Sequence, residues 1–94
     1  MKNKPNPDLY LQMQRFANVT KSFIRRGDMD KARRCLRTAE EIYCKGSAEI
    51  RNALVNVYVF SVSTFLEIRH AKIEHYFPAS LQAAYYQQVN TSGL

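Results

Sequence analysis

The sequence predicts an all-α fold, a four-helix array or bundle that forms a single helical domain over residues 8–90. Glycine and proline number only three each in 94 residues, and this scarcity favours a few long helices over many short strands joined by turns. Apolar residues recur at three- and four-residue spacing along the first half of the chain. The composition, 46% hydrophobic and 23% charged, is that of a folded globular chain. Residues 1–7 are expected to be a disordered lead and residues 91–94 a polar tail.

The first helix is predicted to begin at Pro7-Asp8, with Asp8 as its N-cap. Its apolar stripe has helical spacing and consists of Leu9, Met13, Phe16, either Val19 or Thr20, and Phe23. Arg25 and Arg26 suit the negative end of the helix dipole. Gly27 is the expected left-handed residue that ends the helix.

The second helix is predicted to begin after Asp28, which is a good N-cap residue. Its apolar face consists of Met29, Ala32, Cys35, Leu36, Ala39, Ile42 and Tyr43. The opposite face is charged, and residues four apart on a helix can pair. The expected ion pairs are Asp30–Arg34 and Arg37–Glu41. Gly46 is a glycine exit like the first one, followed by Ser47 as the next N-cap, so the second and third helices should be antiparallel neighbours.

The two cysteines, Cys35 and Cys44, are nine residues apart on the apolar side of the second helix. That separation is too great for a disulfide within one helix, so we interpret them as reduced core thiols of a cytoplasmic protein. The polar start of the chain lacks the apolar stretch of a signal peptide. The most apolar run, residues 53–66, is shorter than the about 20 residues that cross a bilayer. No membrane partner is therefore expected.

The third helix is predicted over residues 48–69, continuing towards Glu74. Its alternating β-branched residues also suit a strand, but the chain has no second run of that kind to pair with it. The expected line along the helix is Ile50, Leu54, Val57, Ser61, Phe65 and Ile68. Pro78 is well placed in the first turn of a fourth helix, whose Leu81 and Ala84 (or Tyr85) should face inward.

Large, small and glycine positions follow a fixed pattern in the first two helices: Phe16, Val19, Thr20, Phe23, Gly27, Ala32, Leu36 and Ala39. Over residues 12–44 this pattern resembles a tetratricopeptide repeat, although Thr20 and Cys44 depart from it and no second repeat follows. The resemblance implies a helical hairpin that presents a partner-binding groove. The groove positions of its first helix would be Gln14, Ala17, Lys21, Ile24 and Arg25. The C-terminal segment, residues 77–94, is similar to the ends of small uncharacterised bacterial helical proteins, which implies no particular activity.

Positive charge is concentrated in residues 21–37, where seven Lys and Arg residues oppose two Asp residues, a local charge of +5 out of +6 for the chain. Such a surface attracts acidic partners. The predicted partner-binding residues are Lys21, Arg25, Arg26, Arg33, Arg34 and Arg37. A protein partner with acidic character is favoured over nucleic acid, since no aromatic stacking platform accompanies the charge.

Arg69 and His75 suggest an alternative function. Their six-residue spacing resembles the Arg-x4–6-His signature of the HEPN family of compact all-α ribonucleases. The resemblance implies metal-independent RNA cleavage, with Arg69 stabilising the phosphorane charge and His75 acting as acid and base.

The sequence as a whole predicts a non-enzymatic protein–protein interaction module, with no cofactor and no metal site. Tyr85 and Tyr86 are adjacent on one helix and cannot both point inward, so one is expected on the surface. Tyr85 and Tyr86 are therefore the candidate residues for self-association as a homodimer.

Overall fold

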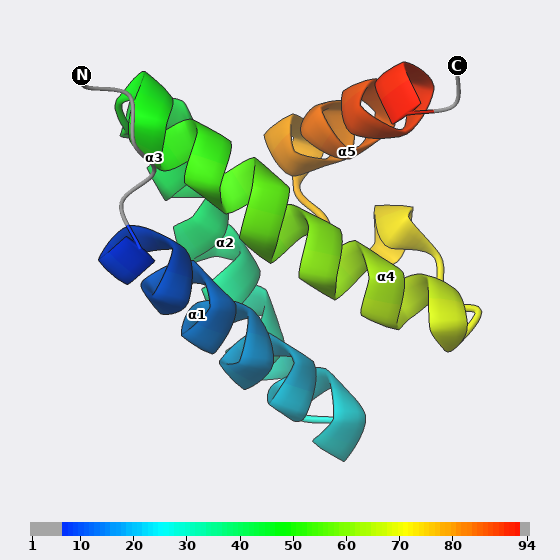
Figure 1. Ribbon diagram of the computed structural model, residues 1–94. Helices are drawn as coiled ribbons and strands as arrows, with labels where there is room; N and C mark the ends of the chain where they lie inside the picture. Colours follow the sequence, from blue (N-terminus) through cyan, green and yellow to red (C-terminus); the bar gives the residue numbers. More distant parts are fainter. Residues whose placement is uncertain (1–6, 93–94) are drawn as a thin grey trace.

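The computed structural model describes the backbone of residues 7–92 and the side chains of residues 8–88. Within these residues the chain is all-α, and the predicted four-helix array is confirmed (Figure 1). α1 begins at Pro7 and α5 ends at Ser92, so the helices extend one residue into the predicted lead (residues 1–7) and two residues into the predicted tail (residues 91–94). The rest of those two predictions, residues 1–6 and 93–94, lies outside the described residues. Because α1 includes Pro7, Asp8 lies in its first turn and is not its N-cap.

The elements follow one another with short connections: α1 (Pro7–Arg26), α2 (Met29–Lys45), α3 (Ala48–Ala53), the π-helical segment η1 (Leu54–Val59), α4 (Phe60–Ile68), the 3-10 turn η2 (Ile73–His75) and α5 (Ala79–Ser92). α3, η1 and α4 form one continuous rod, which we call the central helix. α1 and α2 form an antiparallel hairpin on one side of the central helix, and α5 packs against α2 and η1 (Figure 1).

α1 and α4 end in the same way, with a left-handed residue directly after the C-cap residue. At the end of α1 this residue is Gly27, with φ of 78°, and the amide of Asp28 donates to the Phe23 carbonyl at 2.9 Å. At the end of α4 it is His70, with φ of 59°, and the amide of Ala71 donates to the Leu66 carbonyl at 2.9 Å. Both are Schellman motifs. The second motif ends the helix at Ile68, so the expected continuation to Glu74 is wrong.

Gly46 ends α2 for a different reason. Its backbone is extended, with φ of −77° and ψ of 162°, a conformation that any residue can adopt. A Cβ at this position would lie 2.6 Å from the Ile42 carbonyl oxygen and 3.0 Å from Ile50 Cγ2. Gly46 is therefore required because a Cβ would clash with the last turn of α2 and lie tightly against Ile50 of α3, whereas Gly27, which has no atom near its missing Cβ, is required by its backbone angle.

The π-helical segment changes which residues of the central helix face the core. The expected line ran from Leu54 through Val57 and Ser61 to Ile68, but Ile68 is 73% exposed. The completely buried side chains are instead Leu54, Tyr58, Val59, Val62 and Leu66. A π-helix closes its hydrogen bonds from i to i+5, so its wider turns move the buried face about one residue along the sequence. The prediction of a helix was right. Val57 and Phe65 of the expected line are half-buried against the core, and the prediction was wrong at Ile68.

A buried polar pair connects α1 to this π segment. The Thr20 hydroxyl donates to the Phe16 carbonyl oxygen at 3.0 Å and lies 2.7 Å from the Tyr58 hydroxyl. Since the single hydrogen of Thr20 is used on Phe16, Tyr58 donates to Thr20. The Tyr58 ring stacks on Phe16, with ring centroids 4.5 Å apart, and burial raises the pKa of Tyr58. Of the two residues that the sequence left open, Thr20 is in the core and Val19 is 47% exposed.

α5 is held in place by a carboxylate from α2. The Glu40 side chain accepts hydrogen bonds from the backbone amides of Ser80 at 3.3 Å and Leu81 at 3.2 Å. These amides belong to the first turn of α5, where backbone donors have no partner within the helix. Glu40 therefore caps a helix that lies about 40 residues further along the chain, and the Leu81 side chain is completely buried beside it.

Candidate functional site

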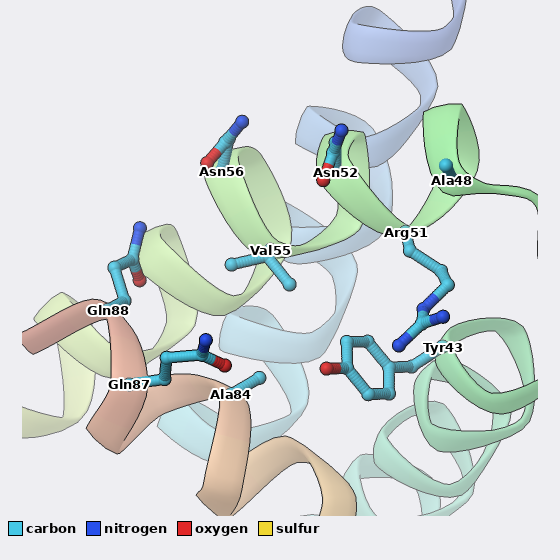
Figure 2. Close-up of a pocket in the computed structure, with 9 residues that line it drawn as sticks. All are labelled: Tyr43, Ala48, Arg51, Asn52, Val55, Asn56, Ala84, Gln87 and Gln88. Carbon is cyan, nitrogen blue, oxygen red and sulfur yellow. The ribbon is translucent and has the colours of Figure 1, made fainter. Parts of the chain in front are cut away.

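An open groove lies between the end of α2, the first half of the central helix and α5. Its volume is about 520 Å³. Figure 2 shows how the three elements surround it. The lining residues are Tyr43 from α2, Ala48, Arg51, Asn52, Val55 and Asn56 from the central helix, and Ala84, Gln87 and Gln88 from α5.

The groove has an apolar floor and a polar rim. Val55 and Ala84 project into the space between the central helix and α5, beside the ring of Tyr43 (Figure 2). Asn52 and Asn56 lie one turn apart on one wall, and Gln87 and Gln88 come from the other wall. Small floor residues such as Ala84, only 3% exposed, keep the space between the two helices open.

One end of the groove carries its positive charge. The Arg51 guanidinium carbon lies 4.7 Å from the centroid of the Tyr43 ring. This cation–π contact attracts the guanidinium to the ring face and restricts its freedom. Arg51 is thereby positioned at the entrance, where α2 and α3 meet.

The side chains that line the groove are suited to binding a ligand through hydrogen bonds. A carboxamide both donates and accepts hydrogen bonds, and the described lining of the groove includes four of them. Its described lining includes no Asp, Glu, His or Cys side chain, the groups that most often transfer protons or hold metals. Across residues 8–88 no three such side chains come together as a metal site.

The π segment contributes directly to the groove. Val55 and Asn56 belong to η1 and line the groove, while Tyr58 and Val59 of the same segment are buried on its other side. π-helical turns are rare and frequently occur at functional sites. This irregularity supports the choice of the groove as the candidate site.

A second, smaller hollow of about 340 Å³ lies between α1 and the other end of the central helix. Its lining includes Phe60 and Ile68, which are 56% and 73% exposed. Lys21, one of the predicted partner-binding residues, also lines it and donates from Nζ to Ser61 Oγ at 2.9 Å. The Lys21 ammonium thus already makes a hydrogen bond within the chain.

The other five predicted partner-binding residues, Arg25, Arg26, Arg33, Arg34 and Arg37, are exposed on α1 and α2. The expected ion pairs Asp30–Arg34 and Arg37–Glu41 are not formed; within residues 8–88 the structure places Lys31 Nζ 3.8 Å from Asp28. Long exposed side chains gain too little from pairing to be held together. The charge of the arginines is therefore not neutralised by neighbouring acids.

Two groove positions of the resembled repeat are not accessible. Ala17 is completely buried and Ile24 is 5% exposed, because the central helix packs against this face of α1.

The position of Cys44 differs from the one predicted. It is exposed rather than in the core, since it lies in the last turn of α2, where its sulfur is 3.6 Å from the Ser80 hydroxyl.

Arg69 and His75 lie on opposite sides of the turn that follows α4. Arg69 is the C-cap residue that follows α4, and its guanidinium carbon is 5.2 Å from the centroid of the Phe65 ring. His75 ends the 3-10 turn η2. Both are exposed, and no hydrogen bond between their side chains is recorded in the described part of the chain.

Tyr85 and Tyr86 bind two carboxylates of their own chain. The Tyr85 hydroxyl donates to Glu67 at the end of α4, and the Tyr86 hydroxyl donates to Glu74 in η2. Tyr86 is the more exposed of the two, at 41%, as expected for adjacent residues of a helix. These contacts attach α5 to the end of the central helix and to η2. A homodimer through the two tyrosines stays a prediction.

The contact with Glu67 predicts a specific alkaline titration. The hydrogen bond to the carboxylate, with some burial, raises the pKa of Tyr85 from 10.0 to about 12. A phenol whose pKa is raised by folding stabilises the fold fully below pH 10.0 and loses this contribution as the pH rises through about 12. In Glu67→Gln the pKa of Tyr85 should fall towards its ordinary value, measured by NMR titration of the ring signals. Glu41→Gln is the matched control, and an unchanged Tyr85 titration in Glu67→Gln would contradict the assignment.

Sequence reasoning missed the groove residues Arg51, Asn52, Asn56, Gln87 and Gln88. A signal was present, since Asn52 and Asn56 are four apart and therefore neighbours on a helix surface. Nothing in the sequence places the two glutamines opposite them, because this depends on the packing angle of α5.

Comparison with known proteins identifies the family of this chain. No curated protein and no solved structure matches the chain significantly. None of the helices in the described part of the chain is long and apolar enough to span a bilayer. A family described as a domain of unknown function, DUF7674, matches residues 2–91, and the chain therefore belongs to that family.

Proposed function

We propose that this protein is a non-enzymatic protein–protein interaction module that binds an extended segment of a partner in the groove between the central helix and α5. The observation that carries the proposal is the lining of that groove: four carboxamides around a floor of Val55 and Ala84. An extended peptide presents alternating backbone N–H and C=O groups, and each of these is a hydrogen-bond partner for an amide side chain.

The charge of the molecule fits an acidic partner. Arg33, Arg34 and Arg37 are exposed on α2, the helix that also supplies Tyr43 to the groove. Exposed cations of one sign accelerate the encounter with an oppositely charged partner, in a salt-dependent way. In this proposal the arginines attract the partner, and the groove binds it.

A blocking variant tests the groove. Asn52 is exposed and lines the groove but not the second hollow, so Asn52→Trp should fill the groove without disturbing the core. Peptides selected from a random displayed library on the unmodified protein should lose at least about tenfold in affinity for this variant. Thr38→Trp, on an exposed position of α2 outside the groove, is the matched control. Equal affinity for both variants, or selected peptides that shift no groove amide in NMR spectra, would refute the proposal.

The alternative function is RNA binding or metal-independent cleavage by Arg69 and His75. Those two side chains have no recorded contact, and Arg69 lies against Phe65, which makes the interaction module the better supported function. RNA binding that weakens steeply with salt, together with loss of cleavage in His75→Ala, would reverse this order.

A further inference from the structure

Arg51 distinguishes one end of the groove from the other. It is exposed and lies over the Tyr43 ring, and in the part of the chain with described side chains no carboxylate is within ion-pair distance of it. The lining of the groove contains no acidic residue among the side chains that the structure describes. Arg51 thus has its guanidinium held against a ring, no carboxylate beside it, and a position at the end of a row of carboxamides. The exposed arginines of α2 do not have these three features together.

The geometry points to a carboxylate as the group that Arg51 binds: we infer that the groove takes an extended peptide whose carboxylate lies at the Tyr43 end. This inference rests on the proposed function and adds the chemical class of the ligand and its direction. A guanidinium is planar and directs its five N–H donors outward in that plane, so stacking on a ring leaves them available. Two of these donors match the two oxygens of a carboxylate.

The side-chain amides that line the groove would then bind the rest of the peptide. Asn52 is next to Arg51 in the chain, and Asn56 is one turn further on. A peptide anchored at Arg51 would run from the Tyr43 end towards Gln88, over Val55 and Ala84. The carboxylate can belong to the C-terminus of a partner chain or to an Asp or Glu side chain, and the test separates these two sources.

Three small peptides serve as probes: N-acetyl-triglycine, which ends in a carboxylate; N-acetyl-triglycinamide, which has none; and N-acetyl-glycyl-aspartyl-glycinamide, whose carboxylate is on a side chain. NMR spectra of the nitrogen-labelled protein report the Arg51 Nε–H and the side-chain amides of Asn52, Asn56 and Gln88 directly. We expect a peptide with a carboxylate to shift these signals with an affinity on the order of 1 mM, the range for so small a ligand. Whichever carboxylate peptide binds more tightly identifies the source.

Arg51→Gln should weaken the binding of the carboxylate peptides by about tenfold or more, because a charge-assisted pair is lost. Arg15→Gln, at an exposed arginine of α1 outside the groove and outside the predicted partner-binding residues, is the matched control and should change nothing. Equal shifts from all three peptides, or no shift at Arg51, overturn the inference. If selected library peptides still bind the groove and Arg51→Gln leaves their affinity unchanged, the carboxylate assignment fails while the proposed function stands. If Asn52→Trp leaves their affinity unchanged, the proposed function itself fails.

Discussion

Tyr58→Ala will lower the free energy of unfolding by about 3–5 kcal/mol, the range for removing a large aromatic side chain from a core. Tyr58 is completely buried, stacks on Phe16 and is the largest fully buried side chain. Its removal leaves a cavity between α1 and the π segment and also removes the partner of the Thr20 hydroxyl. Urea denaturation measures the loss, which is a large part of the total stability of a small domain.

Milder substitutions separate the hydrogen bond from the packing. Thr20→Val leaves the Tyr58 hydroxyl buried without an acceptor, at a cost of about 1–3 kcal/mol, whereas Tyr58→Phe should cost about 0.5–1.5 kcal/mol. The double variant removes both polar groups and should cost less than the sum of the two single variants, because no buried donor is then left unpaired. Strictly additive losses would show that the pair does not interact in solution.

Glu40→Ala is expected to lower the free energy of unfolding by about 1.5–3 kcal/mol, since hydrogen bonds to a charged acceptor contribute in that range. The variant leaves the amides of Ser80 and Leu81 without the acceptor that α2 provides. A negative charge at a helix N-terminus is also favourable because of the helix dipole. Hydrogen exchange of the amides in the first turn of α5 should therefore accelerate more than exchange in α1.

The neighbouring residue provides the control for this prediction. Glu41 is exposed and has the same side chain, so Glu41→Ala should change stability by no more than about 0.5 kcal/mol. Because α5 supplies Ala84, Gln87 and Gln88 to the groove, Glu40→Ala should also weaken peptide binding, although Glu40 does not line it. Equal effects of the two substitutions would show that the contact between α2 and α5 is not a cap.

Local patterns in the sequence were sufficient for the number of helices and most of their ends. Asp28 and Ser47 accept from the amides of Lys31 and Ile50 as N-caps, and Gly27 is left-handed as expected. Each of these features depends on residues within one turn, where the chemistry of a cap or a glycine acts directly on the backbone. The buried face of α2, with Ala32, Leu36 and Ala39, was predicted correctly because a regular helix keeps its period.

The inward face of the central helix could not be predicted in this way. A regular period of 3.6 residues places Ile68 inside, but the π segment shifts the face and leaves Val62 and Leu66 in the core. The end of α4 was also missed, because the left-handed position is held by His70, where glycine is the usual signal.

The sequence by itself determined an all-α chain with a hairpin of two capped helices and a concentration of positive charge, since all of these follow from neighbouring residues. Only the tertiary structure decided that Glu40 caps α5, 40 positions further along the chain, and that two glutamines of α5 and two asparagines of the central helix line one groove. These residues are distant in the sequence, and no local preference specifies the distance or angle between helices, which side-chain packing sets.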